Sequence, residues 1–273
     1  MLGVGAFFAA VLTSMTLFER RTPCSRNSKA AGKVHSALGH KFHGEGQQRG
    51  FPLEDEYIFE HHFSQHGSPP YHSNGTFLEL GAHDGVAVSN TLWLEQALGW
   101  RGVLVEASQR SFESLRRHRG TARNTLRHAA VCPQGQIINY IEPKKVSDSV
   151  MAGMTASMPE VNKHYLPNRH GTLRKLKCTP LGTILQEAGV DHVDFFSLDV
   201  EGAELIVLET INWSAVTFDI LMVELDGKNA TKDVEVRQLL RSKGFRFDDV
   251  TGAFCRAEVW IGQRRPIVRA LQR

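Results

Sequence analysis

The chain has 273 residues, of which 41% are hydrophobic and 22% are charged, as in an ordinary soluble domain with an apolar core. Its formal net charge of +3 is too small to indicate a nucleic-acid partner, and none is expected. The four cysteines form no Cys-x-x-Cys pair, which argues against zinc or thioredoxin-like chemistry. They also give no sign of a disulfide framework, and we expect mostly buried thiols at Cys24, Cys132, Cys178 and Cys255.

An uncharged apolar run opens the chain. Residues 2–18 carry no charge and have the minimum length for a membrane-spanning helix, about 17 residues. We favour a single-pass signal anchor over residues 1–18, with a cleaved signal peptide or a plain apolar tail as alternatives. The arginines that follow would leave the domain in the cytoplasm. The glycosylation triplets that begin at Asn74 and Asn229, in contrast, would be used only in the lumen of the ER or Golgi, so the membrane side stays open.

Two segments precede the main pattern. Residues 19–50 are basic and poor in large apolar side chains, which predicts a disordered linker, and a folded domain is expected over residues 51–265. The first part of this domain has apolar residues near helical spacing, which predicts a helix that packs on the domain or covers a ligand. His61, His62 and His66 lack the i, i+4 spacing of a helical metal pair, so we expect them to face solvent.

From Thr76 onward, short apolar strands alternate with helical patterns, which predicts an α/β fold with a doubly wound, mainly parallel, Rossmann-like sheet. The last two apolar segments are joined around Thr251-Gly252 and predict a terminal antiparallel β-hairpin. The predicted strands cover residues 76–80, 102–106, 125–131, 193–198, 219–225, 245–250 and 254–262. The predicted helices cover residues 89–98, 109–118, 181–188, 202–210 and 232–242.

Two stretches depart from this simple alternation. Residues 142–180 are irregular, and because long loops in compact domains are usually functional, this one is a candidate cover for a substrate. Several arginines gather around the second predicted helix with a single acid, Glu113, and we interpret them as a solvated helix face followed by a loop. These are Arg110, Arg116, Arg117, Arg119, Arg123 and Arg127.

The turn after the first strand carries unusual chemistry. In doubly wound sheets, ligands bind beyond the carboxyl ends of the strands, and here the turn is GAHDG, residues 81–85. Its two glycines allow a tight turn beneath a ligand. A dinucleotide would require G-x-G-x-x-G and bare amides for its pyrophosphate, whereas this turn places two carboxylates, Glu79 and Asp84, beside the ligand. Such acids favour S-adenosylmethionine, which carries an ammonium and a sulfonium group.

Glu106 ends the second predicted strand. An acid at this position accepts hydrogen bonds from the two hydroxyls of a ribose, so it indicates an adenosine-containing cofactor. Enzymes that use NAD have the same feature, and Glu106 therefore does not separate the two cofactors by itself.

The quoted turn belongs to a series of motifs. FLELGAHDGVAVSNTLWLE, GVLVEA, HAAVC and FFSLDVEGAELIVL occur in this order between about Thr76 and Asp226. They resemble the motifs of the FkbM-like family of class I S-adenosylmethionine-dependent methyltransferases. Ser197 is a departure, because many relatives carry lysine there. The resemblance implies that S-adenosyl-L-methionine is bound by Glu79, Gly81, Ala82, Asp84, Gly85, Ser89, Asn90, Glu106, Ala130 and Asp199, with Glu106 at the ribose and Ala130 near the adenine.

The acceptor side is expected at Asp199, which follows the fourth predicted strand. Methyl transfer is an in-line displacement that depends on alignment, and a hydroxyl acceptor must also lose its proton to a base. Asp199, Glu201, Glu224 and His83 are the candidate catalytic residues, and His128 is a weaker alternative base. Asp199, Glu224 and Asp226 would form an oxygen-rich group able to hold Mg²⁺, but the resemblance requires no metal and we assign none.

These expectations define a function with two alternatives. The expected activity is O-methylation of a hydroxyl on a glycan, a lipid or a small metabolite. The first alternative is a membrane-tethered interaction protein that keeps a methyltransferase fold, which turnover would exclude. The second is a nicotinamide-dependent oxidoreductase, which the missing third glycine disfavours and which cofactor binding would test.

Overall fold

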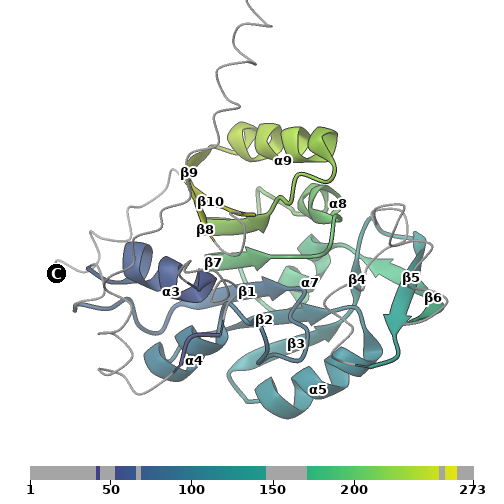
Figure 1. The fold of residues 1–273 in the computed structure, drawn as a ribbon, viewed down its shortest axis with the longest axis horizontal. Coiled ribbons are helices and arrows are strands. Elements are labelled where there is room, and N and C mark those ends of the chain that lie inside the picture. Colours follow the sequence, from purple (N-terminus) through teal and green to yellow (C-terminus); the bar gives the residue numbers. More distant parts are fainter. Residues whose placement is uncertain (1–40, 44–52, 66–68, 146–170, 252–255, 263–273) are drawn as a thin grey trace, which may run out of the picture.

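The computed structural model describes residues 41–43, 53–65, 69–145, 171–251 and 256–262 (Figure 1). Within these residues, a seven-stranded sheet has the order β3-β2-β1-β7-β8-β10-β9. Five strands run parallel, and β10 pairs antiparallel with both β8 and β9, so the predicted fold class is confirmed. The strands are β1 (Thr76–Leu80), β2 (Arg101–Glu106), β3 (Asn124–His128), β7 (His192–Leu198), β8 (Thr217–Glu224), β9 (Phe245–Thr251) and β10 (Ala257–Gly262).

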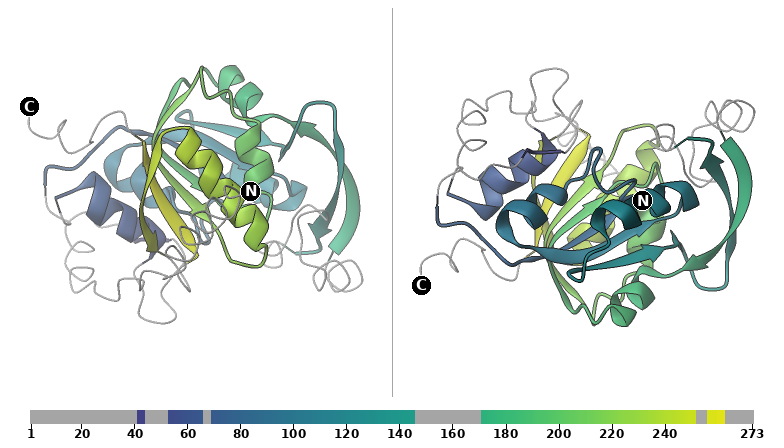
Figure 2. Two further views of the ribbon diagram at one scale, coloured as in Figure 1. Left: turned by 90° about the horizontal axis from the view of Figure 1, so that it is seen from above. Right: turned by 90° about the horizontal axis from the view of Figure 1, so that it is seen from below.

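Helices cover both faces of this sheet, as the views along it show (Figure 2). Neighbouring strand residues point to opposite faces, so Phe77 packs in one apolar core and Leu78 in the other. The Phe77 core contains α3 (Glu54–Ile58), the π-helical turn η2 (Phe59–Phe63), α4 (Leu92–Leu98) and α5 (Gln109–Arg119). The Leu78 core contains α7 (Leu181–Glu187), α8 (Glu204–Glu209) and α9 (Ala230–Ser242). Burial on both faces explains why the parallel strands read as continuous apolar runs.

The two long helices begin at side-chain caps that the sequence supplies. The Ser108 hydroxyl accepts a hydrogen bond from the Ser111 amide at the start of α5, at 3.2 Å. The Asn229 side chain accepts from the Lys232 amide at the start of α9, at 3.1 Å. Each cap satisfies an amide that has no partner within its helix. The beginning of α5, directly beyond β2, is thereby fixed at the edge of the sheet where a ligand is expected.

A smaller three-stranded sheet extends from the carboxyl end of β3 and has the order β4-β6-β5 (Figure 1). It contains β4 (Ala130–Val131), β5 (Ile137–Pro143) and β6 (Gly171–Thr179). The predicted strand over residues 125–131 is therefore divided at Ala129. The prediction of irregular structure over residues 142–180 is wrong for β6. This strand exposes most of its side chains, several of them basic, so it lacks the apolar run on which the prediction relied.

A disulfide between Cys132 and Cys178 closes this smaller sheet, and both residues are buried. The expectation of free thiols is wrong for this pair. The two cysteines are 46 residues apart in sequence. They meet only because Ala130 of β4 pairs in register with Cys178 of β6. Sequence spacing gives no sign of such a tertiary contact.

The segment before β1 packs on the domain. Phe59 lies 4.4 Å from Trp93 between ring centroids, and Phe63 lies 4.6 Å from Trp100. The expectation that the histidines here face solvent is wrong for His62, which is buried 3.6 Å from Asp248. Burial lowers the pKa of His62 to about 4, which the Asp248 carboxylate opposes. His61 is exposed, and His66 lies outside the described residues.

The predicted N-terminal anchor, residues 1–18, lies outside the described residues. No helix in the described part of the chain is both long and apolar enough to cross a membrane. Residues 41–43, within the predicted linker 19–50, are described, and the Phe42 ring stacks on Trp93 with centroids 4.5 Å apart. The prediction of a disordered linker is therefore wrong for residues 41–43, because Phe42 belongs to the apolar core.

Candidate active site

The turn after β1 requires glycine at positions 81 and 85 because neighbouring residues leave no room for a side chain there. A Cβ atom on Gly81 would lie 1.8 Å from the carbonyl oxygen of Asp199, and a Cβ on Gly85 would lie 2.6 Å from the Leu115 side chain. Both glycines have positive φ, +84° and +79°, which other residues rarely adopt. The amide of Gly81 donates to the carbonyl of Val105 at 3.1 Å. The turn is therefore held against β2, β7 and α5 with its backbone close to the carboxyl ends of the strands.

Glu79 organises the segment that begins the next helix. Its carboxylate accepts hydrogen bonds from the Ser89 hydroxyl at 3.0 Å, the Asn90 amide at 2.7 Å and the Thr91 hydroxyl at 2.6 Å. Burial raises the pKa of Glu79, while Arg119 and these hydrogen bonds oppose the rise. Glu79, Ser89 and Asn90 are thus brought together as expected. These hydrogen bonds, together with the nearby Arg119, give Glu79 the role of fixing the shape of the turn.

Arg119 corrects the interpretation of the arginine-rich helix as a solvated face. Its side chain is only 1% exposed, whereas Arg117 is exposed. The guanidinium donates to Glu95 at 2.6 Å and to the Gly85 carbonyl at 3.0 Å, and it lies 3.8 Å from Glu79. Sequence periodicity could not reveal this arrangement, because the partners of Arg119 come from the turn and from α4.

Asn90 links the turn to the N-terminal helix. Its side-chain amide donates to Glu54 of α3 at 2.9 Å and to the Ser197 hydroxyl at 3.1 Å. Glu54 was not anticipated from the sequence, because its place depends on how α3 packs. The Ser197 hydroxyl thus accepts a hydrogen bond from a neutral amide.

Asp84 is held within the turn itself. One of its oxygens, Oδ1, accepts from the amides of Val86 at 2.9 Å and Ala87 at 2.8 Å. His83 lies beside it, with Nδ1 3.4 Å from the same oxygen. Burial alone would raise the pKa of Asp84, but the hydrogen bonds from His83 and the two amides hold it well below its ordinary range. Asp84 therefore remains a carboxylate at any pH near neutral.

Glu106 lies at the carboxyl end of β2, as expected. Its Oε2 accepts from the His83 amide at 2.9 Å, and its Oε1 accepts from the Ser108 amide at 2.7 Å. Burial raises the pKa of Glu106 to about 7, although these two hydrogen bonds oppose the rise. A carboxylate has about four acceptor positions, so both oxygens retain capacity for further donors such as ribose hydroxyls.

Two residues of β5, Tyr140 and Glu142, lie near Glu106 and the start of α5. Neither was predicted from the sequence. Glu142 accepts hydrogen bonds from the Ser108 hydroxyl at 2.9 Å and from the Gln109 amide at 3.2 Å at the start of α5. An acid is favourable at this end of a helix. Tyr140 is buried, and burial together with the charges of Glu106, Glu142 and Glu201 raises its pKa well above the usual value.

Acids converge at the carboxyl ends of β7 and β8. The Asp199 carboxyl is hydrogen-bonded to Glu224, and burial together with the charges of Glu224, Glu201 and Glu54 raises the pKa of Asp199 far above its ordinary value. Burial and the Glu224 charge raise the pKa of Glu201 to about 8. Carboxyl groups with pKa values shifted toward neutrality are suited to take up a proton from an acceptor.

The remaining predicted residues lie at the margins of this group. Asp226 pairs with Lys228 at 2.6 Å. His128 is exposed, lies 3.0 Å from the Ala107 carbonyl and stacks on Phe112, which gives it a structural role on the outside of α5. Ala130 is buried in a small apolar cluster. This cluster lies beside the end of β2, where Glu106 is predicted to bind the ribose. Ala82 is buried in the turn.

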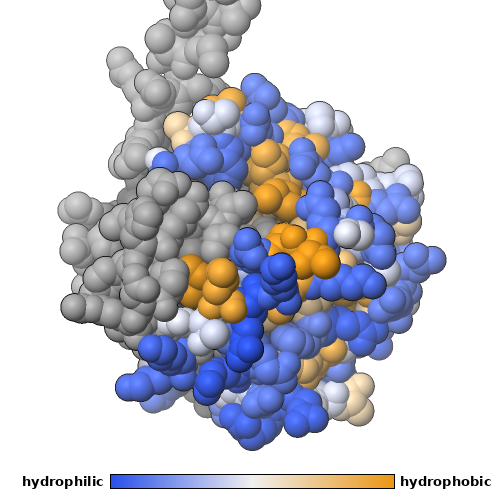
Figure 3. Space-filling model, turned by 90° about the vertical axis from the view of Figure 1, so that its right-hand side faces the viewer, coloured by the Kyte–Doolittle hydropathy of each residue, from blue (hydrophilic) through white to orange (hydrophobic). Residues whose placement is uncertain are grey.

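The surface on this side of the molecule is mixed. Apolar patches lie between larger polar areas on the side toward which the second sheet extends (Figure 3). Among the exposed large apolar side chains are Val88, after the turn, which is 39% exposed, and Ile137 of β5, which is 68% exposed.

A doubly wound sheet with an acid after β2, a glycine turn after β1 and acids after β7 defines a class I methyltransferase architecture, and S-adenosyl-L-methionine is the methyl donor of that class. Residues 79–247 match the methyltransferase FkbM domain family. The chain belongs to this family of methyltransferases, as its motifs predict. No curated protein matches the chain.

Two solved structures show partial similarity to the chain. The chain is similar to methyltransferase FkbM from Methylobacillus flagellatus, with 12% identity and a TM-score of 0.46 over 74% of this chain and 47% of that one. It therefore spans about half the length of that protein. It is also similar to fibrillarin from Aeropyrum pernix, solved with natively bound S-adenosyl-L-methionine, with 15% identity and a TM-score of 0.39 over 71% and 68% of the two chains.

Proposed function

We propose that the protein methylates a hydroxyl oxygen of a glycan, a lipid or a small metabolite. The observation that carries this proposal is the hydrogen-bonded pair Asp199 and Glu224 at the ends of β7 and β8, with Glu201 beside it. A hydroxyl is a weak nucleophile until its proton leaves. Two hydrogen-bonded carboxyl groups hold one proton between them, so the ionised member of the pair can accept the proton of the hydroxyl.

The residues present fit the cofactor. Glu106 is placed to accept from ribose hydroxyls, since its oxygens already accept from two backbone amides and retain further lone pairs. The acids on the adjacent strand ends favour a ligand that carries positive charge. When bound, S-adenosylmethionine supplies a methyl group from its sulfonium to the acceptor oxygen: the sulfur–carbon bond breaks as the oxygen–carbon bond forms.

The protein's own contribution is position and proton transfer. We assign the Asp199–Glu224 pair as the proton acceptor: one member holds the proton of their mutual hydrogen bond, and the ionised member takes the proton of the hydroxyl. The hydrogen bond from Asn90 to Glu54 fixes the turn after β1 against α3. Alignment of the acceptor hydroxyl against this pair accounts for most of the rate that such an enzyme provides.

The test is transfer of a labelled methyl group from S-adenosylmethionine into fractions of an extract of the source cells by the full-length protein. We expect a labelled product whose mass is increased by one methylene unit and whose label sits on oxygen. Cofactor binding without any labelled product from glycan, lipid or metabolite fractions would favour the interaction-protein alternative. A label on nitrogen or sulfur would contradict the O-methyltransferase proposal while leaving the family unchanged.

We further propose that the domain lies on the luminal side of a secretory membrane, held by residues 1–18. The Cys132–Cys178 disulfide supports this side, because disulfides persist in oxidising compartments. The exposed Asn74 is an available glycosylation acceptor, whereas the Asn229 side chain caps α9. We expect the protein to stay with membranes in carbonate and to shift on gels after endoglycosidase treatment. Loss of that shift in Asn74→Gln is the matched control, and an insensitive protein would contradict the proposal.

A further inference from the structure

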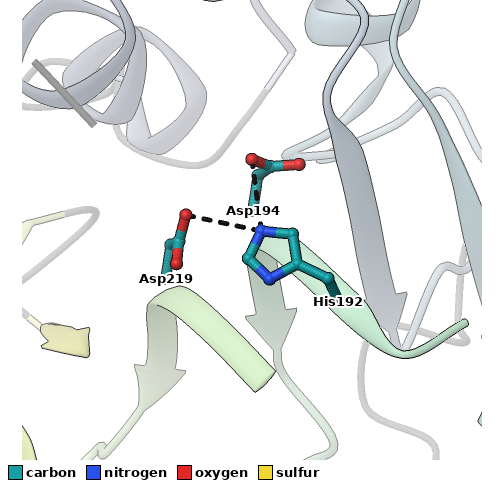
Figure 4. Close-up of side chains that lie close together, drawn as sticks. All are labelled: His192, Asp194 and Asp219. Carbon is teal, nitrogen blue, oxygen red and sulfur yellow. Dashed lines mark ion pairs between the residues drawn. The ribbon is translucent and has the colours of Figure 1, made fainter. Parts of the chain in front are cut away.

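A second group of polar residues lies at the opposite edge of the main sheet. His192 and Asp194 are near the amino end of β7, and Asp219 is near the amino end of β8 (Figure 4). The imidazole nitrogen Nε2 of His192 lies 3.5 Å from Asp194 Oδ1 and 3.4 Å from Asp219 Oδ2. Asp194 precedes Asp199 by five residues, so the group lies roughly 16 Å from the active site along the strand. It is independent of the proposed methyl transfer.

The hydrogen bonds around these residues orient them. The Thr217 hydroxyl donates to the Asp191 carbonyl at 3.3 Å, so its oxygen is available to accept from Nδ1 of His192 at 2.9 Å. This places a proton on Nδ1 and directs Nε2 toward the two carboxylates. Partners of this kind fix the tautomer of metal-binding histidines.

Asp194 is oriented in the same way. Its Oδ2 accepts from the Thr76 amide at 2.7 Å, which leaves Oδ1 directed toward His192. Nε2 of His72 also lies 3.1 Å from Oδ1. The carboxylate is therefore fixed by β1 on one side and by the segment before β1 on the other. One oxygen of Asp194 is committed to the backbone and the other is presented to the cluster.

The spacing of the three atoms suits a metal ion. Tetrahedral zinc binds nitrogen and oxygen ligands at about 2.0–2.1 Å, which separates neighbouring ligand atoms by about 3.3 Å. The observed separations of 3.5 Å and 3.4 Å are close to that edge length and longer than the usual hydrogen-bond range of about 2.7–3.2 Å. All three ligand atoms lie within 4.8 Å of one another.

We propose that His192, Asp194 and Asp219 bind a divalent transition-metal ion, with zinc as the representative ion. One imidazole and two carboxylates suit such ions better than they suit calcium or magnesium. A divalent ion balances both carboxylates. His192 is 39% exposed, so an ion can reach the site from solvent and a further ligand can bind to it.

The alternative is that His192 acts only as a positively charged link between β7 and β8. The two interpretations differ in whether these three side chains bind zinc, which an ion pair between the strands does not require.

The experiment is equilibrium dialysis of zinc with full-length protein first stripped by EDTA, with the bound metal counted by mass spectrometry. We expect one zinc in the wild type that is absent, or bound at least tenfold more weakly, in His192→Ala and Asp219→Asn. His61→Ala, which removes an exposed histidine outside the cluster, is the matched control and should bind as the wild type does.

Two further measurements keep the test decisive if a variant is unstable. Thr217→Val leaves the three ligands in place but removes the partner of Nδ1, and we expect zinc affinity to fall about 10- to 100-fold. Zinc should raise the melting temperature of the wild type and not that of Asp219→Asn. Equal zinc binding by the wild type, His192→Ala and Asp219→Asn would overturn the proposal and leave the cluster as an ion pair between strands.

Discussion

The buried guanidinium of Arg119 lies 3.8 Å from the carboxylate of Glu79, so the end of α5 is joined to the turn that begins the cofactor site. The same side chain donates to the Ser89 hydroxyl at 3.1 Å and stands over the Phe77 ring at 5.5 Å. The shape of the turn therefore depends on a residue 40 positions away from Glu79 in the sequence.

Arg119→Met should destabilise the protein strongly. The substitution leaves the buried carboxylate of Glu79 without its cation, and breaking a buried pair in this way costs about 3–5 kcal/mol of unfolding free energy. Arg117→Met, on the exposed side of the same helix, is the control and should change stability by no more than about 0.5 kcal/mol. Urea unfolding followed by circular dichroism measures both. Equal small losses would show that the pair does not hold the turn.

The main sheet could be predicted from the sequence because its strands are buried on both faces. β1 and β7 are mostly apolar, although Glu79 interrupts the first and Asp194 and Ser197 interrupt the second. The acids at their ends could be assigned from the rule that ligands bind beyond the carboxyl ends of parallel strands. Glu106 and Asp199 were found by this reasoning, and the structure places them at the expected edge.

The positions of the remaining site residues depend on tertiary contacts that leave no recognisable pattern in a single sequence. Tyr140 and Glu142 lie on β5, which pairs with the mostly exposed β6 and has no continuous apolar signal. Glu54 belongs to a five-residue helix whose position is set by aromatic packing. Arg119 looked like one more surface arginine because its acidic partners come from other elements.

Glu106→Gln should weaken cofactor binding at least tenfold. Each charge-assisted hydrogen bond to a ribose hydroxyl contributes about 1.5–3 kcal/mol, and part of it is lost with the charge. The amide also matches the His83 and Ser108 amides poorly, so the melting temperature of the free protein should fall. Glu142→Gln is the control because it too loses bonds to backbone amides near α5. Equal weakening of S-adenosylhomocysteine binding in both variants, measured by calorimetry, would make Glu106 a structural residue only.

Asp199→Asn should lower kcat by about 10²-fold or more, the usual contribution of a positioned acid–base group. The substitution keeps the size of the side chain and removes its capacity to take a proton. Cofactor affinity should change much less, since the ribose contacts remain. Asp191→Asn, on the exposed side before β7, is the control. A raised KM for the cofactor with normal kcat would assign Asp199 to cofactor binding and move the search for the base to Glu224 and His83.

The stability of the protein without cofactor should fall as the pH rises from 6.5 to 8. The pKa of Glu106 is about 7 and that of Glu201 about 8, both above the ordinary 4.5, so the folded state holds protons that the unfolded state has released. This contribution is complete below pH 4.5 and is lost as the pH rises through the folded values. His62, whose pKa is lowered to about 4, acts in the opposite direction only below about 6.5.

Urea unfolding at constant ionic strength measures the slope, and Glu201→Gln should flatten it between pH 6.5 and 8. A stability that rises over this interval in the wild type would contradict the assignment of raised pKa values to the acids of the site.

Removal of the Cys132–Cys178 disulfide should destabilise the protein by about 4 kcal/mol, as the chain-entropy model gives for a loop closed over 46 residues. Dithiothreitol should lower the urea midpoint of the wild type. It should leave the midpoint of a Cys132→Ala, Cys178→Ala double variant unchanged, since that protein has no such bond to reduce. A wild type that is insensitive to the reductant would show that the bond does not stabilise the fold.

The same disulfide has an evolutionary consequence. β4 and β6 are paired and cross-linked at the edge of the sheet, and β5, which lies between them in the sequence, pairs with β6 along its length. The smaller sheet is thus a covalently closed unit of its own. Its sequence can diverge without any change in the register of the seven main strands, except at Glu142, which is hydrogen-bonded to the start of α5.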